Sequence, residues 1–374
     1  MLTNLHIENF KSIHNLDIEL GKVNVFIGEN GCGKSNILEA VALASATQDD
    51  RLKNDDLALK GIRITRPDMM INSFLGTKST NEIIISHTNL FSQGDVYFTT
   101  EYHLTNNDHS NILTTWRGIK TSTGMQNSLI LQETVIPLAK EQTSFLSRFK
   151  QYIIYELQTN PLRGFNKQSY EIPGRNGENL DFLLENFSKE EWAQILNHSK
   201  FISWLDDNGI MVDKDGDLGR KRLKLRSDSK LYFRDKFMQK KNNVFSVENA
   251  NEGALHILFY LALFISKKTP SFFAIDNIEN ALNPYLCRHL MKNIAEIANK
   301  NEKQALITTH NPAILDGLNL HDDNQRLFVV SRNKKGHTTV KRIQIKPDVE
   351  VGGKKLKLSE LWMRNHLGGI PQNF

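Results

Sequence analysis

Residues 23–36 carry the pattern from which the rest of this chain can be understood: Val23-Asn24-Val25-Phe26-Ile27-Gly28-Glu29-Asn30-Gly31-Cys32-Gly33-Lys34-Ser35-Asn36. An apolar run typical of a buried strand enters the pattern G-x-x-x-x-G-K-S, and a helical pattern follows from Ile37 to Ala46. In such a loop, glycines let consecutive N–H groups surround a phosphate chain, while the lysine reaches the β- and γ-phosphates. The positive end of the next helix faces the same anion. The pattern therefore predicts a P-loop that binds a nucleoside triphosphate.

The loop supplies most of the contacts that we expect for ATP and Mg²⁺. Lys34 is the expected catalytic lysine, and the Ser35 hydroxyl is the first expected metal ligand. A glycine turn without a nucleotide would lack the flanking strand and helix, and both are present here. The residues expected to bind the nucleotide are Asn30, Gly31, Cys32, Gly33, Lys34, Ser35 and Asn36.

Length and composition limit the classes of protein to consider. The chain has 374 residues and a hydrophobic content of 39%, enough for one large domain or two to three ordinary ones. Its longest apolar run, Ala254 to Ile265, is too short to span a bilayer, and no signal-peptide layout opens the chain. We therefore expect a cytoplasmic protein without a membrane partner. The two cysteines, Cys32 and Cys287, are too few for a disulfide framework, and we expect free thiols.

Positive charge is concentrated in one segment. Residues 220–241 hold ten Lys and Arg against two Asp, a net charge of +8 in a chain whose formal net charge is +5. Such a segment is typical of a contact with nucleic acid or an acidic partner, although a solvated face of ordinary charge would have the same composition. The expected contact residues are Arg220, Lys221, Arg222, Lys224 and Arg226.

The order of the predicted elements differs from a simple alternation of strands and helices. Three β-rich runs follow the first helix, at Glu82–Ser86, Val96–Leu104 and Ile112–Trp116. Clusters of turn residues separate them, which indicates an antiparallel flap beside an α/β nucleotide core. This part, residues 1–137, forms the expected N-terminal lobe.

Residues 138–245 are predicted to be an inserted helical arm that ends in the basic segment. Aromatic and apolar residues recur there at helical spacing in Phe145–Leu157, Leu180–Phe187 and Trp192–Trp204. Residues 246–345 form the expected C-terminal lobe. The remaining tail, 346–374, is apolar enough to dock on its own core or on another protein.

The C-terminal lobe holds the second half of the expected site. An apolar run, Ser271 to Ile275, predicts a buried parallel strand that ends at Asp276. A carboxylate fixed at a strand tip opposite Ser35 is the second expected Mg²⁺ ligand. The next strand ends at His310, whose imidazole would lie beside the same phosphates and could polarise the attacking water.

At this point the chain resembles the ABC-type ATPase heads of the SMC, RecF and OLD-like group, over Leu5–Ala46 and Glu252–Arg332. Residues 5–12 are similar to the family's opening strand, which implies that Lys11 and Ser12 lie near the nucleotide. The P-loop matches its Walker A motif, and Phe272–Asp276 its Walker B motif. Residues 280–284 occupy the D-loop position, and His310 that of the switch histidine. Asn251-Glu252-Gly253 stands where the family has its signature Ser-x-Gly.

The resemblance implies a homodimer in which two ATP molecules lie between the P-loop of one subunit and the signature turn of the other. Asn251 and Gly253 are then expected to contact the partner's nucleotide. The N-terminus of the following helix is itself suited to bind an anion. ATP would stabilise the dimer, and hydrolysis would release it.

Two residues depart from the family pattern. Asn277 stands where the family has the glutamate that accepts a proton from water, and Asn251 replaces the signature serine. An amide orients water but accepts no proton, so we expect slow hydrolysis. We favour Asn277 as the residue that positions water, with Glu279 as the alternative base. Among glutamines, Gln48 is only a weak candidate for the family's Q-loop.

The expected fold is an α/β P-loop NTPase head of ABC/SMC type, without the acidic cluster of a Toprim nuclease after residue 330. The expected function is an ATPase that controls a separately encoded effector, a nuclease or a toxin, in anti-phage defence. One alternative is a RecF-like repair ATPase that holds duplex DNA through residues 220–241. The other is a scaffold that binds ATP with little hydrolysis.

Overall fold

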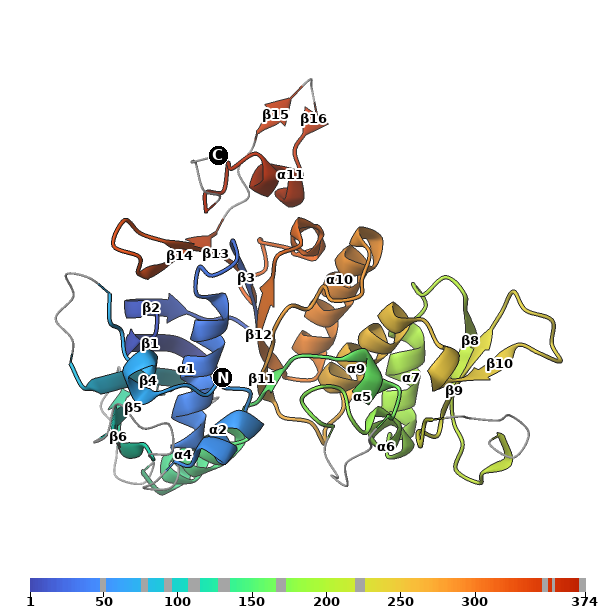
Figure 1. The fold of residues 1–374 in the computed structure, drawn as a ribbon, viewed down its shortest axis with the longest axis horizontal. Coiled ribbons are helices and arrows are strands. Elements are labelled where there is room, and N and C mark those ends of the chain that lie inside the picture. The colour runs from blue at the N-terminus through green and yellow to red at the C-terminus, as the bar shows by residue number, and fades with distance from the viewer. Residues whose placement is uncertain are drawn as a thin grey trace.

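A six-stranded sheet forms the centre of the molecule in the computed structural model (Figure 1). The structure describes residues 1–47, 52–74, 80–90, 96–106, 115–126, 135–165, 173–218, 226–344, 349–351 and 354–369. The strand order is β14-β13-β3-β12-β11-β7, and only β14 is antiparallel to its neighbour. The bounds are β3 Val23–Ile27, β7 Ile154–Tyr155, β11 Phe272–Ile275, β12 Gln304–Thr309, β13 Gln325–Arg332 and β14 Thr338–Ile343.

The parallel strands place the expected motifs at one edge of this sheet. The P-loop follows β3, Asp276 follows β11, and His310 follows β12. Because β12 lies between β3 and β11, these three carboxyl ends are neighbours. Ligands of open α/β sheets bind at this edge.

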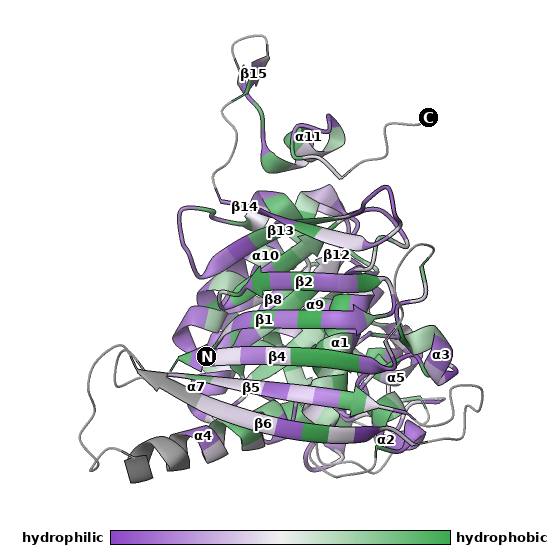
Figure 2. Cartoon of the chain, turned by 90° about the vertical axis from the view of Figure 1, so that its left-hand side faces the viewer, coloured by the Kyte–Doolittle hydropathy of each residue, from purple (hydrophilic) through white to green (hydrophobic). Residues whose placement is uncertain are grey.

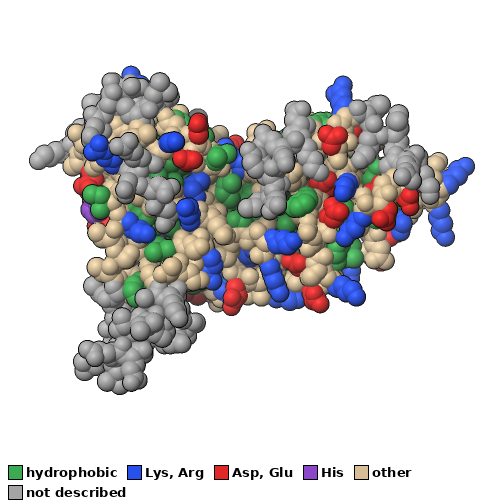
Figure 3. Space-filling view, turned by 90° about the horizontal axis from the view of Figure 1, so that it is seen from below, with side chains coloured by type: hydrophobic (Ala, Val, Ile, Leu, Met, Phe, Trp, Pro, Cys, Tyr) green, Lys and Arg blue, Asp and Glu red, His purple; other side chains and the backbone are tan. Residues whose placement is uncertain are grey.

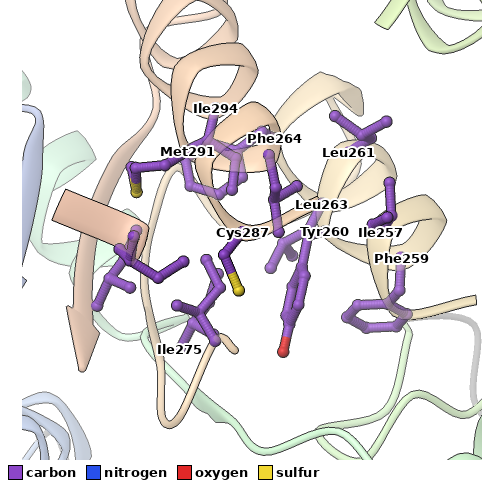
Figure 4. Packing of buried hydrophobic residues seen from close by; sticks show 14 of the residues in the cluster. Ile257, Phe259, Tyr260, Leu261, Leu263, Phe264, Ile275, Cys287, Met291 and Ile294 are labelled. Carbon is purple, nitrogen blue, oxygen red and sulfur yellow. The ribbon is translucent and has the colours of Figure 1, made fainter. Parts of the chain in front are cut away.

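Each face of the central sheet is covered by its own apolar core. Val25, Ile27 and Ile275 contact the core formed with α9 (Glu252–Ile265) and α10 (Pro284–Lys300). Figure 4 shows Phe264, Met291 and Cys287 packed together in this core. Nearly every residue of α9 is buried, which confirms the prediction from its all-apolar pattern. Both cysteines are free and buried.

The opposite face packs against α1 (Lys34–Ala46) and a five-stranded antiparallel sheet. The order of that sheet is β2-β1-β4-β5-β6, which confirms the expected flap. Figure 2 looks onto this sheet, whose strands alternate between hydrophilic and hydrophobic residues. Two short helices, α2 (Asn54–Leu59) and α3 (Pro67–Met70), follow α1. The strand bounds are β1 Leu2–Phe10, β2 Ile13–Glu19, β4 Glu82–Leu90, β5 Val96–Thr105 and β6 Arg117–Gln126.

The insertion predicted to be helical contains the expected helices but also four strands, which the prediction missed. The helix over Phe145 ends at Phe149, and Ile154–Tyr155 forms β7 at the edge of the central sheet. A three-stranded antiparallel sheet, β10-β9-β8, follows the helices. The elements are α4 Val135–Phe149, α5 Thr159–Leu162, α6 Leu180–Glu185, α7 Lys189–His198, β8 Leu205–Val212, β9 Leu231–Asp235, β10 Val244–Ser246 and the 3-10 helix η2 Val247–Asn249. Residues of β8 and β9 belong to the same core as α9, so the small sheet is firmly attached to the head.

The C-terminal tail packs on the chain's own core (Figure 2). Leu361 and Trp362 of α11 (Leu358–Met363) are buried, and Ser359 donates two hydrogen bonds to Asp316, of 3.0 Å from its N–H and 2.8 Å from its hydroxyl. Asp316 lies in η3 (Pro312–Gly317), directly after the switch histidine region. A short hairpin of β15 (Glu350–Val351) and β16 (Lys354–Lys355) precedes α11. In the described part of the chain, no helix is long and apolar enough to cross a membrane.

Candidate functional site

The P-loop conformation depends on its glycines. Gly33 has a φ of 110°, in the left-handed region, and a Cβ there would lie 2.1 Å from Oγ1 of Thr338. At Gly28, a Cβ would lie 2.2 Å from the carbonyl oxygen of Val330. Neither position accepts a side chain without movement of its neighbours. The loop is therefore wedged against β13 and β14, which fixes its shape.

Lys34 lies at the centre of the site. Its Nζ donates hydrogen bonds to the carbonyl oxygens of Gly28 (2.8 Å) and Glu29 (2.9 Å) and lies 3.1 Å from Nδ1 of His310. Burial lowers the pKa of the Lys34 ammonium. Because an ammonium can only donate, Nδ1 of His310 accepts, which leaves the ring proton on Nε2. The structure thus brings the predicted lysine and the predicted switch histidine together.

Ser35 and Asp276 meet as the sequence predicted. The Ser35 hydroxyl is 2.9 Å from Oδ2 and 3.2 Å from Oδ1 of the Asp276 carboxylate. The buried hydroxyl of Thr308 donates a further hydrogen bond to Oδ1. A hydroxyl and a carboxylate at this spacing fit Mg²⁺, which takes one or two protein ligands and completes its shell with water and phosphate oxygens. Consistently, no group of three or more His, Cys, Asp or Glu in the described residues forms a metal cage of its own.

Asn277 and Glu279 occupy different places. Asn277 lines the pocket, has a φ of 54°, and donates its backbone N–H to Oγ1 of Thr308 at 2.9 Å. Glu279 does not line the pocket. Its Oε1 accepts the backbone N–H of His310 at 2.7 Å, and its buried Oε2 has no hydrogen-bond partner among the described residues. Glu279 thus holds the switch loop, while Asn277 faces the pocket.

The pocket has a volume of about 300 Å³ and includes two arginines that sequence reasoning missed. Nη2 of Arg63 is 3.2 Å from Oδ1 of Asn36, and Nε of Arg332 donates to the carbonyl oxygen of Gly31 at 2.8 Å. Arg63 reaches the pocket from the loop after α2 and Arg332 from the end of β13, and no local pattern marks either residue. The lining residues are Asn30, Gly31, Gly33, Lys34, Ser35, Asn36, Arg63, Asn277, His310 and Arg332.

Three residues expected at the nucleotide have buried contacts of their own and do not line the pocket. Lys11 forms an ion pair with the buried carboxylate of Glu39, and burial lowers its pKa. The buried hydroxyl of Ser12 lies 2.7 Å from both Oγ1 of Thr338 and Nδ2 of Asn36. Cys32 is also buried, which raises the pKa of its thiol. Their contacts support the loop instead.

The turn at the signature position is outside this pocket. The Asn251 side chain caps α9 by accepting the backbone N–H of Ala254 at 3.2 Å. Gly253 is packed closely against the D-loop, since a Cβ there would lie 2.8 Å from the carbonyl oxygen of Ala281. Neither Asn251 nor Gly253 lines the P-loop pocket of its own chain.

Most of the predicted basic contact residues cannot be placed. Arg220, Lys221, Arg222 and Lys224 lie outside the described residues. Arg226 is exposed, and its backbone N–H donates to Oε1 of Glu248 at 2.6 Å. Figure 3 shows Lys and Arg side chains at the end of the molecule that holds β8–β10, interspersed there with Asp and Glu.

Comparison with known proteins places the chain in a family. The AAA_23 family, described as AAA domain, matches residues 4–327. The chain belongs to this family. This AAA domain has the fold of SMC heads. The SMC head domain from Thermotoga maritima superposes on it over 92% of this chain and 99% of that one, at 13% identity and a TM-score of 0.51. An Smc head bound to the C-winged helix domain of ScpA matches at 16% identity and a TM-score of 0.58, over 91% of this chain and 97% of that one.

Sequence relatives of the AAA domain match over shorter regions. The DNA replication and repair protein RecF of Streptococcus suis is 42% identical over 55 residues, 14% of this chain and 15% of RecF. An uncharacterized protein of Methanocaldococcus jannaschii, MJECL10, is 27% identical over 157 residues, 41% of this chain and 61% of that protein. The chain therefore spans only a small part of RecF and less than two thirds of MJECL10.

Proposed function

We propose that this AAA domain binds ATP with Mg²⁺ and hydrolyses it slowly. Lys34 and the N–H groups of the P-loop would hold the phosphates, and Ser35 with Asp276 would hold the metal, which neutralises charge on the phosphate oxygens when bound. The observation that carries this proposal is that Lys34 and Ser35 line one pocket and that the Ser35 hydroxyl contacts the Asp276 carboxylate, which lies just outside the lining residues. Asn277 would orient the attacking water, and its amide accepts no proton, so turnover is slow.

The active form in this proposal is a dimer with ATP between the subunits. The signature turn at Asn251 presents the N-terminus of α9, a 14-residue helix suited to bind an anion. Because that turn does not line its own chain's pocket, the nucleotide of a second copy would supply the anion. ATP then stabilises the dimer through differential binding, and hydrolysis releases it.

The dimer would control a separately encoded effector, a nuclease or a toxin, in anti-phage defence. This step is supported by the resemblance to small OLD-like ATPases rather than by a contact within the chain. Within the chain, a series of contacts connects the site to the C-terminal tail. Glu279 holds the backbone of His310, η3 follows His310, and α11 packs on η3. Movement of the switch loop would therefore displace the tail.

Light scattering with and without ATP·Mg²⁺ tests the dimer, and phosphate release measured beside it tests turnover. The wild-type mass should double with ATP·Mg²⁺, and phosphate release should be slow. Lys34→Ala should abolish both. Lys53→Ala, which removes an exposed lysine, should change neither. Turnover that Lys34→Ala abolishes would exclude the scaffold alternative, whereas ATP binding with no turnover would support it.

A second candidate is a RecF-like DNA-repair ATPase that holds duplex DNA through residues 220–241. It is favoured by the exposed lysines of this segment at the β9–β10 turn, namely Lys236, Lys240 and Lys241. Binding of duplex DNA that weakens steeply with salt, and is lost when these charges are reversed, would support it. Absence of DNA binding by the wild type at low salt would exclude it.

A further inference from the structure

The turn between β9 and β10 presents an aromatic ring to solvent among lysines. Phe237 is 75% exposed, the highest fraction among the large hydrophobic side chains that the structure describes, and its neighbour Met238 is 45% exposed. The Nζ of Lys236 lies 5.3 Å from the centroid of the Phe237 ring. Residues 236–242 contain three lysines and no acidic residue. None of these lysines forms an ion pair with a described residue.

The turn is ordered by its backbone, so the ring is held outward. Oδ1 of Asp235 accepts the Phe237 N–H at 2.8 Å, and the Asp235 N–H donates to the carbonyl oxygen of Asn243 at 2.8 Å. The Lys236 N–H donates to the carbonyl oxygen of Trp204 at 3.1 Å. Behind the turn, Phe233 and Phe245 pack as facing partners of β9 and β10. These hydrogen bonds hold the backbone of the turn, while the side chains of Phe237 and Met238 remain exposed.

We propose that this turn binds single-stranded nucleic acid, with Phe237 stacked on an unpaired base and the lysines on the flanking phosphates. An aromatic side chain beside positive charge is the usual combination in proteins that bind single strands. A duplex hides its base faces in the stack, so the ring has no equivalent partner there. A membrane is a weaker fit, because one ring and one methionine bury little apolar area and one short turn carries few charges.

The inference rests on nucleic-acid binding by the same basic segment as the DNA-binding candidate, but it assigns that binding to one turn and to an unpaired strand instead of a duplex. It does not depend on ATP, because Phe237 lies outside the residues that line the P-loop pocket. Stacking and phosphate contacts are common to DNA and RNA, so the binding test includes a single strand of each.

The test measures binding of fluorescently labelled oligothymidine, oligouridine and a fully paired DNA duplex by fluorescence anisotropy. The wild type should bind at least one single strand more tightly than the duplex. Phe237→Ala should weaken that binding about tenfold, as expected for loss of one stacked base. Phe237→Trp should retain it. Phe182→Ala, which removes a partly exposed ring from α6, is the matched control and should have no effect.

Charge variants distinguish binding of a single strand at this turn from binding of a duplex by the same lysines. Replacing Lys236, Lys240 and Lys241 by Gln should reduce the dependence of affinity on salt by a slope of about 0.7 for each lost phosphate contact. If the duplex binds through these lysines and Phe237→Ala has no effect, the inference is wrong and the duplex clamp stands. If no nucleic acid binds, or if only vesicles containing phosphatidylserine bind, both are wrong. Phe237→Ala should leave phosphate release and the melting temperature unchanged, which excludes misfolding as the cause.

Discussion

The Ser35 hydroxyl donates a hydrogen bond of 2.9 Å to Oδ2 of Asp276, a residue 241 positions further along the chain. The contact joins the P-loop to the tip of β11 across the intervening strand β12. Both groups are hard oxygen ligands, and Mg²⁺ prefers such ligands. The two halves of the site are therefore assembled by the fold of one chain.

Asp276→Asn should abolish Mg²⁺-dependent phosphate release. The amide keeps the shape of the side chain and can still accept the Ser35 hydroxyl, but it loses the charge that attracts the metal. Binding of ATP in the presence of EDTA should persist, because Lys34 is unchanged. The matched control is Asp215→Asn, which removes a carboxylate from an exposed turn and should leave release intact. Unchanged Mg²⁺ dependence in Asp276→Asn would contradict the metal assignment.

Thr308→Val should lower both stability and metal affinity. The fully buried Thr308 hydroxyl donates to Asp276 and accepts the Asn277 N–H, so valine leaves that N–H without its partner. A buried group left unsatisfied costs about 1–3 kcal/mol. Chemical denaturation measures the first effect, and a Mg²⁺ titration of phosphate release the second. Ser45→Ala also removes a buried hydroxyl, but one that bonds only within α1, and should leave the Mg²⁺ titration unchanged.

Asn277→Glu should accelerate hydrolysis and reduce stability. Glutamate supplies the missing proton acceptor. The φ of 54° at this position suits asparagine better than glutamate, and an ordinary side chain in the left-handed region costs about 1–2 kcal/mol. Asn277→Gly separates the two effects, because glycine adopts a positive φ without strain but supplies no base. This variant should be folded and should hydrolyse ATP slowly. If Asn277→Glu is no faster than wild type, then Asn277 does not limit hydrolysis.

Stability should fall as the pH is lowered from 6.5 towards 4. Burial lowers the pKa of His256 from 6.5 to about 4, and neither ring nitrogen has a hydrogen-bond partner among the described residues. Between these values the unfolded chain takes up a proton that the folded chain does not, so the free energy of unfolding decreases with decreasing pH. His256→Phe should reduce this slope in denaturation curves measured at several pH values, and a contribution should remain from His87, whose pKa burial lowers to about 3. His321→Gln, at an exposed position, should retain the slope.

Much of the head was predictable because its signals are local. The P-loop, the strand before Asp276 and the apolar helix after Gly253 each lie in one short segment, and the structure confirms all three elements. The neighbourhood of Ser35, Asp276 and His310 followed from a general rule, that parallel strands share their carboxyl edge.

The remaining features depend on tertiary contacts that local patterns do not record. The apolar spacing around Ile154 and Tyr155 suggested a helix. They form a two-residue strand because β11 offers an edge with which they pair, and the sequence does not record this contact. Trp204 likewise continued a helical pattern but lies just before β8, packed on Phe245. Arg63 reaches the pocket from a loop and Arg332 from the end of β13, and a single arginine has no signature in sequence.

The proposed dimer is tested most directly by mixing two variants that are each defective on a different side of the nucleotide. Lys34→Ala impairs the P-loop. Asn251→Asp keeps a good helix cap but places a negative charge where the partner's phosphates would lie. A heterodimer of the two contains one composite site in which both sides are intact.

Phosphate release is the measurement. We expect activity to be lost in each variant alone and to return in part when equal amounts are mixed, because each heterodimer contains one intact site of two; a dimeric mass in the presence of ATP·Mg²⁺ should accompany it. If the mixture stays as inactive as its components while the wild type hydrolyses ATP as a monomer, the site is complete within one chain and the nucleotide-bridged dimer is wrong.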